Sequence, residues 1–336
     1  MTGSVLACFL ILLGAGASVS DEAPPPDLAA LKAKYRRPAE IPFPASNPYS
    51  EAKSKLGRVL FFDPILSASR RIACSSCHNP SLSWGDGLAR AVGEKQLSLR
   101  SPTLLNVAWT PRLGWTGHFR NLEAVAFGPI TSPDNMNLSE AELIERLSAI
   151  PGYVEAFHAA FGDDEITRRK IELALATFER SIVSDDAPFD RWVRGDEKAL
   201  GSAAKRGFAL FNGKANCAAC HGGWAFTDSS FHDIGTARGE DVGRGSLFPS
   251  STKLQYAFKT PTLRDVARRG PYMHDGSVAT LTAVIDLYDK GGIDRPSRSE
   301  DIKPLHLTAQ EKADLLAFLR TLTSAPEAVT VPTLPR

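Results

Sequence analysis

Apolar residues recur at helical spacing in several segments of the chain, and residues that cap helices precede these segments. Ser50 precedes a helical pattern that continues to Phe62, where Asp63-Pro64 is expected to end it. Further helices are expected from Ser139 and over residues 164–183, 277–290 and 308–322. Two of the starts form capping boxes, Ser139 with Glu142 and Thr308 with Glu311. Strand signals are few and short, so the pattern predicts a mostly α fold.

The same order of features occurs twice along the chain. LGRVLFF, which begins at Leu56, is echoed by KRGFALF from Lys205, and SPTLLNV from Ser101 is echoed by TPTLRDV from Thr260. Recurrence in the same order is typical of an internal duplication. We therefore predict two homologous, mostly helical domains at residues 50–186 and 187–324, which meet in a polar turn.

The two ends of the chain differ from these domains. Residues 1–20 contain a short apolar run that ends in small residues, which predicts a secretory signal peptide. No Lys or Arg precedes the run, so an uncleaved anchor or a mis-set start is the alternative; a lipoprotein box at Cys8 is disfavoured because the run continues past it. Residues 21–49 are expected to form a Pro-rich extended tether, and residues 325–336 a tail along the surface.

Each predicted domain contains a Cys-x-x-Cys-His pentad. In such a pentad two thiols add to the vinyl groups of a haem, and the adjacent imidazole binds the iron. A structural zinc site would not need a His after each second Cys, and a disulfide redox motif would not need to occur twice. We therefore expect two covalently attached haem c groups and, because they are attached outside the cytoplasm, a periplasmic protein. The residues are Cys74, Cys77 and His78, then Cys217, Cys220 and His221.

The composition narrows the class of protein further. A chain of 336 residues is long enough for two domains with cores of their own. Its formal charge of +1 provides neither a nucleic-acid surface nor a polybasic membrane patch. We therefore expect no nucleic-acid partner, and no stable membrane insertion once the signal segment is removed.

These motifs resemble the bacterial di-haem cytochrome c peroxidase family, and within it the MauG-like branch. The resemblance runs from about Leu56 to Leu322 and includes both pentads, LGRVLFFDP, SPTLLNVAW, GPITSPDNM and FKTPTLRDVARRGPYMHDGSVATL. It implies two cytochrome c-like haem domains. It also implies that the N-terminal haem binds hydrogen peroxide, that the C-terminal haem passes electrons, and that a tryptophan and a calcium ion lie between them.

The resemblance also assigns the sixth iron ligands. At the second haem, Tyr288 stands where the cytochrome c-oxidising members have Met, and this is the MauG-like arrangement; Met273 and His274 are the competing ligands. A phenol is a harder and more electron-donating ligand than a thioether, so it is expected to lower the iron potential. At the first haem, Glu94 stands where members that need reductive activation have a distal His. We therefore expect the first iron to be open.

The groups that would assist peroxide chemistry depart from the family pattern. Asn135 and Val125 replace the family's distal Glu and Gln, and Asn cannot accept a proton at neutral pH. The sequence does not choose among the possible substitutes, which are Glu94, Glu123, Asp134 and His118. Trp115, in Gly-Trp-Thr-Gly, matches the bridging tryptophan of the family and is the expected electron relay.

The calcium position also departs from the family. The resemblance implies ligation by the backbone carbonyls of Arg269 and Pro271, but Arg100 replaces the side-chain ligand Asn. A cation at that position weighs against calcium, which requires oxygen donors.

The leading hypothesis is a periplasmic di-haem peroxidase whose electron donor is a protein side chain or a small redox protein. A non-catalytic electron-transfer cytochrome is the alternative, and a redox sensor is a weaker one. The missing Glu and Gln favour the electron-transfer cytochrome, whereas the missing distal His disfavours it.

Overall fold

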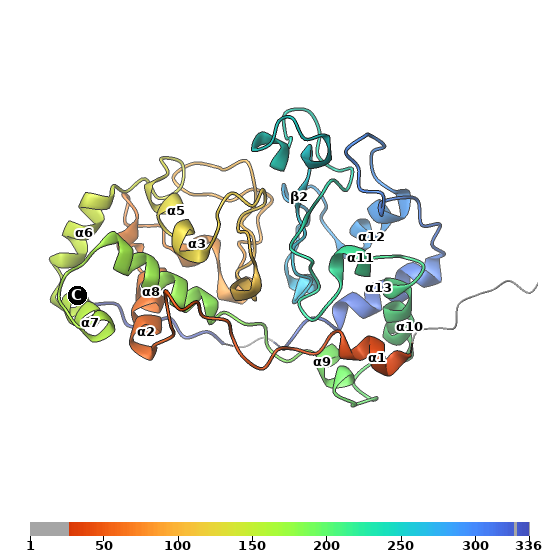
Figure 1. Ribbon diagram of the computed structural model, residues 1–336, viewed down its shortest axis with the longest axis horizontal. Coiled ribbons are helices and arrows are strands. Elements are labelled where there is room, and N and C mark those ends of the chain that lie inside the picture. The colour runs from red at the N-terminus through yellow and green to blue at the C-terminus, as the bar shows by residue number, and fades with distance from the viewer. Residues whose placement is uncertain (1–26, 326–327, 336) are drawn as a thin grey trace, which may run out of the picture.

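A computed structural model describes residues 27–325 and 328–335, and within them helices pack into two groups (Figure 1). The predicted signal peptide lies outside these residues. The helices are α1 (Leu28–Ala33), α2 (Glu51–Phe62), α3 (Cys74–Cys77), α4 (Leu122–Val125), α5 (Phe127–Thr131), α6 (Glu140–Ser148), α7 (Pro151–Phe161), α8 (Arg168–Arg180), α9 (Pro188–Val193), α10 (Ser202–Asn212), α11 (Ala218–His221), α12 (Leu281–Lys290) and α13 (Ala309–Arg320). Short 3-10 helices are η1 (Pro64–Leu66), η2 (Pro80–Leu82), η3 (Val107–Trp109), η4 (Arg244–Ser246), η5 (Thr252–Leu254) and η6 (Val266–Arg268). The strands β1 (Phe231–His232) and β2 (Phe258–Lys259) pair antiparallel, with Phe231 opposite Lys259.

The duplication is visible in how the main helices meet. A Cβ atom on Gly57 of α2 would lie 2.0 Å from the carbonyl oxygen of Ala174 in α8. A Cβ atom on Gly207 of α10 would likewise lie 2.0 Å from the carbonyl oxygen of Asp314 in α13. Both glycines belong to the echoed motifs, and each lies four residues before a phenylalanine, Phe61 in the first motif and Phe211 in the second. Because only glycine permits so close an approach, each helix pair is built in the same way, and the predicted fold class is confirmed.

The predicted caps are found, whereas two predicted helix starts were too early. Ser50, Ser139 and Thr308 each cap a helix with their side chains. The helix expected from residue 164 begins after Thr167, because Asp163 accepts a hydrogen bond from the Glu165 N–H and makes a local turn. The helix expected from residue 277 begins after Thr280, because the bridge between Tyr272 and Val278 keeps the preceding chain extended.

Each end of the chain packs against the domain that is farther from it in sequence. The expectation of an extended tether is wrong for residues 28–33, which form α1, because the Asp27 side chain caps the segment. Tyr35, which is 2 % exposed, then inserts among the aromatic rings of the C-terminal core. Its ring centroid lies 5.0 Å from that of Phe226.

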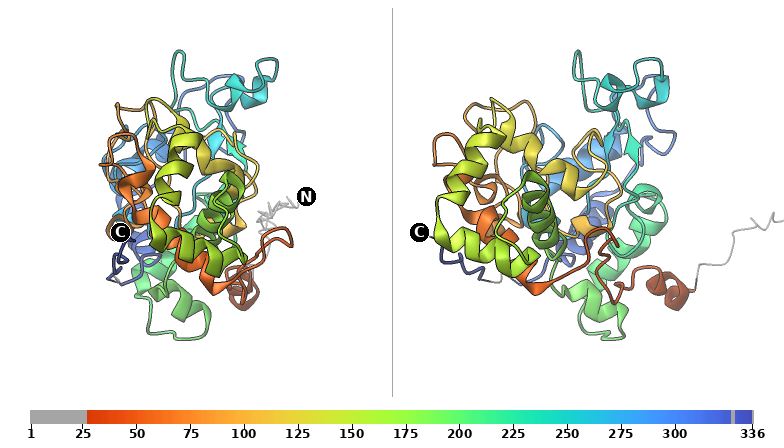
Figure 2. Two further views of the ribbon diagram at one scale, coloured as in Figure 1. Left: turned by 90° about the vertical axis from the view of Figure 1, so that its left-hand side faces the viewer. Right: turned by 60° about the vertical axis from the view of Figure 1, so that its left-hand side comes forward.

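The C-terminal tail makes the reciprocal contact. Leu334 packs against the N-terminal core, and Arg58 donates a hydrogen bond to the carbonyl of Thr330. In Figure 1, α1 lies beside α10 on one side of the molecule, and the C-terminus lies beside α7 on the other. Figure 2 shows the same separation of the two ends from other directions. Among the residues described, none of the helices has the length and apolar character needed to cross a bilayer.

Candidate functional site

Both pentad histidines are half-buried and held by a backbone carbonyl. The Nδ1 atom of His221 lies 2.9 Å from the carbonyl oxygen of Phe226, and that of His78 lies 3.3 Å from the carbonyl oxygen of Trp84. A ring N–H that donates to a carbonyl leaves Nε2 as the metal-binding nitrogen. Burial lowers the pKa of both imidazoles, so both favour the neutral form that binds iron.

None of the four pentad cysteines is paired in a disulfide. Burial raises the pKa of Cys217 to about 12 and also raises the pKa of Cys74 and Cys77. These cysteines form no disulfide within either pentad, so their sulfur atoms are available for attachment to a prosthetic group.

A cavity of about 370 Å³ opens around His221 and Tyr288. Such a volume is in the range of cofactor sites. Tyr288 comes from α12, and burial raises the pKa of its phenol. Met273 and His274 line the same cavity, but the Nε2 atom of His274 lies 2.6 Å from the Asp241 carboxylate. His274 is therefore already engaged by an acid, which weakens it as a competitor of Tyr288.

Buried cations in this cavity fit the carboxylates of a haem. Arg100 and Arg269 both line it, and the Nε atom of each is buried without a hydrogen-bond partner among the described residues. Burial lowers the pKa of Arg269 to about 10 and that of Lys259, which also lines the cavity, to about 8. Unpartnered buried donors are costly, and an anionic ligand such as a haem propionate would satisfy them. The residues present therefore fit a haem at this site.

Trp115 lies where the two domains meet. It borders the cavity, and its Nε1–H donates to the carbonyl oxygen of Arg100 at 2.9 Å. Its ring centroid lies 6.5 Å from that of His274, which occupies the equivalent position of the second repeat. Two equivalent backbone bonds join the domains here, from Arg100 N to His274 O at 3.0 Å and from Lys259 N to Trp115 O at 2.8 Å. Trp115 is thus fixed by both domains.

Two of the acid-base candidates, together with Asn135, gather on two loops beside the first pentad. The Glu94 N–H donates to the Asn135 carbonyl at 2.7 Å, and the carbonyl oxygen of Val92 lies 3.7 Å from the Cys77 sulfur. The Oε1 atom of Glu94 is buried without a partner among the described residues. Asp134 instead forms an exposed ion pair with Lys95 at 2.9 Å. Of the two acids, Glu94 is thus the one whose buried carboxylate oxygen has no partner among the described residues.

Glu123 and His118 are placed differently. Both oxygens of Glu123 accept from Arg180, at 2.7 and 2.9 Å, and one also accepts from Asn47 at 3.0 Å. Burial opposes ionisation of this carboxyl, but these hydrogen bonds outweigh it and lower its pKa. His118 is exposed and packs its ring edge-on against Phe119. Glu123 is thus committed to a buried ion pair.

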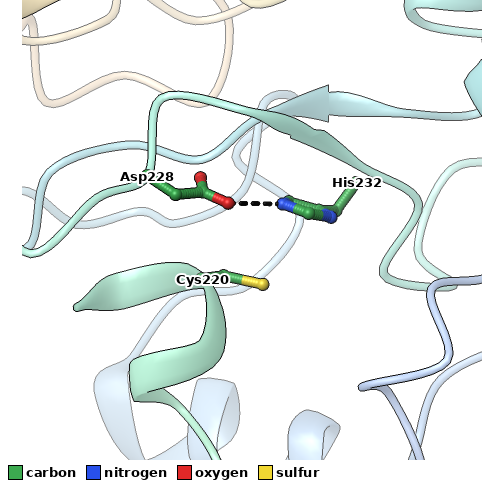
Figure 3. A group of neighbouring side chains, drawn as sticks. All are labelled: Cys220, Asp228 and His232. Carbon is green, nitrogen blue, oxygen red and sulfur yellow. Dashed lines mark hydrogen bonds and ion pairs between the residues drawn. The ribbon is translucent and has the colours of Figure 1, made fainter.

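One further group of polar side chains lies beside the second pentad. His232 on β1 lies 2.7 Å from the carboxylate of Asp228, and both lie next to Cys220 (Figure 3). The ligand atoms of all three lie within 4.8 Å of one another. Because Cys220 belongs to the pentad, only the His232–Asp228 pair is left as a local feature of the second site. The spacing of these two residues, four positions apart, was the available signal.

The residues at the implied calcium position do not fit that ion. The carbonyl oxygen of Arg269 accepts a hydrogen bond from Arg100 Nη2 at 3.0 Å. Pro271 follows a cis Gly270–Pro271 peptide bond in the same segment. An oxygen that would coordinate calcium is instead bound to a guanidinium, and a second cation beside it would be repelled.

Comparison with known proteins places this geometry in context. Residues 51–198 match the family model for di-haem cytochrome c peroxidase, and residues 204–323 match the model for cytochrome c. The chain is 54% identical to the methylamine utilization protein MauG of Methylorubrum extorquens, over 95% of this chain and 92% of that protein. It is 33% identical to the cytochrome c551 peroxidase of Nitrosomonas europaea, over 88% and 86% of the two chains. The crystal structure of a MauG-like protein associated with microbial copper homeostasis superimposes with a TM-score of 0.80 at 33% identity, covering 85% of this chain and 94% of that one.

Proposed function

Because the chain belongs to the di-haem cytochrome c peroxidase family, we propose that it is a periplasmic oxidoreductase that uses hydrogen peroxide at the N-terminal haem and draws electrons through the C-terminal haem. The donor is a protein side chain or a small redox protein. Similarity to a methylamine utilization protein favours a role in the same process.

The pentads would hold the two haems covalently, through Cys74 and Cys77 in one domain and Cys217 and Cys220 in the other. The haem iron, when bound, supplies the redox chemistry. His78 and His221, whose imidazoles favour the neutral form, would bind the two irons. Trp115, which both domains hold in place, would relay electrons between the two sites.

The observation that carries the proposal is the asymmetry between the two sites. Tyr288 lines the same cavity as His221, which favours a phenol oxygen as the sixth ligand of the second iron. In the first domain, the residue in the place of a distal His is Glu94, whose Oε1 is buried and unpartnered among the described residues. A carboxylate can accept a proton from peroxide, whereas the neighbouring Asn135 can only donate or accept a hydrogen bond. Glu94 would therefore take over proton transfer.

Electron paramagnetic resonance of the diferric holoprotein tests the asymmetry. We expect a high-spin signal from an open first iron and a low-spin signal from the second, together with consumption of added peroxide. Low-spin signals alone, with no peroxide consumption, would contradict the proposal of a peroxidase and support a non-catalytic electron-transfer cytochrome.

Two substitutions test the assigned residues separately. Tyr288→Met is expected to raise the potential of the second haem, because a thioether stabilises the ferrous state better than a phenol does. Glu94→Gln is expected to lower kcat/KM for peroxide by about 10²–10⁴-fold, the usual range for a lost acid-base group. Asp134→Asn, on the adjoining loop but in an exposed pair, is the matched control and is expected to leave kcat/KM unchanged.

A non-catalytic electron-transfer cytochrome is the second candidate. It is favoured by Asn135 and Val125, which stand where the family resemblance implies Glu and Gln. This candidate is preferred if the wild-type protein consumes peroxide no faster than a free haem peptide does and the substitution Glu94→Gln leaves that rate unchanged.

A further inference from the structure

A buried arginine joins the two domains where the family resemblance implies a calcium ion. Arg100 is 8 % exposed and belongs to the N-terminal domain, directly before the Ser101-Pro-Thr motif. Its Nη2 atom donates to the carbonyl oxygen of Arg269, in the C-terminal domain, at 3.0 Å. A backbone oxygen that would serve a metal ion is thus already bound to a positive charge of the protein.

The backbone of Arg100 connects the same contact to the tryptophan between the sites. Its N–H donates to the carbonyl oxygen of His274 at 3.0 Å, and its carbonyl accepts from the Trp115 indole at 2.9 Å. Arg100 therefore contacts the C-terminal domain twice, at the carbonyl oxygens of Arg269 and His274, and also binds the Trp115 indole of its own domain. A shift of Arg100 would be passed directly to Trp115.

The second repeat provides an internal comparison. Lys259 precedes Thr260-Pro-Thr as Arg100 precedes Ser101-Pro-Thr, and its N–H donates to the Trp115 carbonyl at 2.8 Å. The two backbones therefore make equivalent bonds across the interface. Their side chains differ, because that of Arg100 bonds to a carbonyl of the other domain.

We propose that the Arg100 guanidinium is the permanent cation of this interface, that it takes the place of a divalent ion, and that it holds Arg269 and Trp115 in position without calcium. Arginine is protonated at neutral pH, and it cannot be removed by a chelator. The proposal concerns the assembly of the two domains and does not depend on the peroxide reaction.

Metal analysis and spectroscopy of the purified holoprotein test it. We expect wild-type protein to hold less than stoichiometric calcium after gel filtration, and its resting EPR spectrum and melting temperature to be unchanged by EGTA or by added calcium. Wild-type protein that retains stoichiometric calcium, or whose spectrum changes on chelation, would overturn the proposal whether or not it consumes peroxide.

The substitution Arg100→Asn removes the cation and supplies an amide oxygen. We expect this variant to bind calcium at least about tenfold more tightly than wild type, measured by calorimetry, and to show an EPR spectrum that EGTA alters and calcium restores. Arg90→Asn makes the same change at an exposed position and is expected to behave as wild type. If Arg100→Asn folds and its spectrum ignores calcium, the proposal fails. If it does not fold, Arg100→Lys replaces it: the retained charge predicts resistance to EGTA, and sensitivity to EGTA would refute the proposal.

Discussion

Replacing Glu123 by alanine tests whether this carboxylate is a structural ion-pair partner or an acid-base group. Its side chain and that of Arg180 are each 7% exposed and share two hydrogen bonds. Alanine would leave the Arg180 guanidinium buried and unpaired. Lys53, whose pKa burial lowers with help from Arg180, lies close enough to add repulsion.

Loss of one partner of a buried pair costs about 3–5 kcal/mol of unfolding free energy. At about 2–4 °C for each kcal/mol, the N-terminal domain is expected to melt about 6–20 °C lower. Differential scanning calorimetry of the holoprotein measures this shift. Asp134→Ala, which breaks a pair whose side chains are 55% and 71% exposed, is the control and is expected to cost less than about 1 kcal/mol.

Stopped-flow mixing with peroxide completes the test. The Glu123→Ala protein, assayed below its melting temperature, is expected to keep the wild-type rate of Soret change. In the double variant with Arg180→Met, part of the lost stability is expected to return, since no buried charge is left unpaired. An unchanged melting temperature together with a slowed peroxide reaction would refute the structural assignment of Glu123.

Three other predictions concern packing and pH. Gly207→Ala places a Cβ atom 2.0 Å from the Asp314 carbonyl oxygen and is expected to lower the free energy of unfolding by at least about 1–3 kcal/mol. Gly201→Ala, whose Cβ atom would have no atom within 4 Å, is the control and is expected to cause no such loss. Urea unfolding of the two variants measures the difference. Tyr35→Ala is expected to destabilise the C-terminal domain by about 3–5 kcal/mol in the same assay, and a loss confined to the N-terminal domain would contradict it. Burial raises the pKa of Glu179 from 4.5 to about 8, so the folded state binds a proton that the unfolded state releases. Stability is therefore expected to fall as pH rises from about 5 to 8, by up to about 1.4 kcal/mol for each pH unit, and Glu179→Gln is expected to abolish this slope in thermal melts.

The local chemistry of the chain could be predicted from sequence because it depends on short spacings. The pentads place two thiols and an imidazole on one turn, and Ser50, Ser139 and Thr308 cap helices through bonds to residues three positions away. The duplicated motifs also predicted two homologous, mostly helical domains, and the structure adds that Gly57 and Gly207, one in each motif, make equivalent close contacts between helices.

Contacts between distant segments could not be predicted in this way. No periodicity indicates that Glu123 pairs with Arg180, that the Glu94 loop bonds to Asn135, or that the Asp228 and His232 pair meets Cys220. Each depends on how loops of irregular backbone cross. The resemblance gave the positions of the candidates, and the three-dimensional contacts then separated Glu94 from Glu123.

The reciprocal packing of the chain ends means that neither half of this protein is complete by itself. A fragment that starts at residue 187 would lack Tyr35, whose ring packs in the C-terminal core. A fragment that stops at residue 186 would lack Leu334, which packs against the N-terminal core. The Tyr35 segment must therefore wait until the C-terminal domain has been synthesised before its ring is enclosed. Each end of the chain thus secures the domain that is formed mainly by the other half of the sequence.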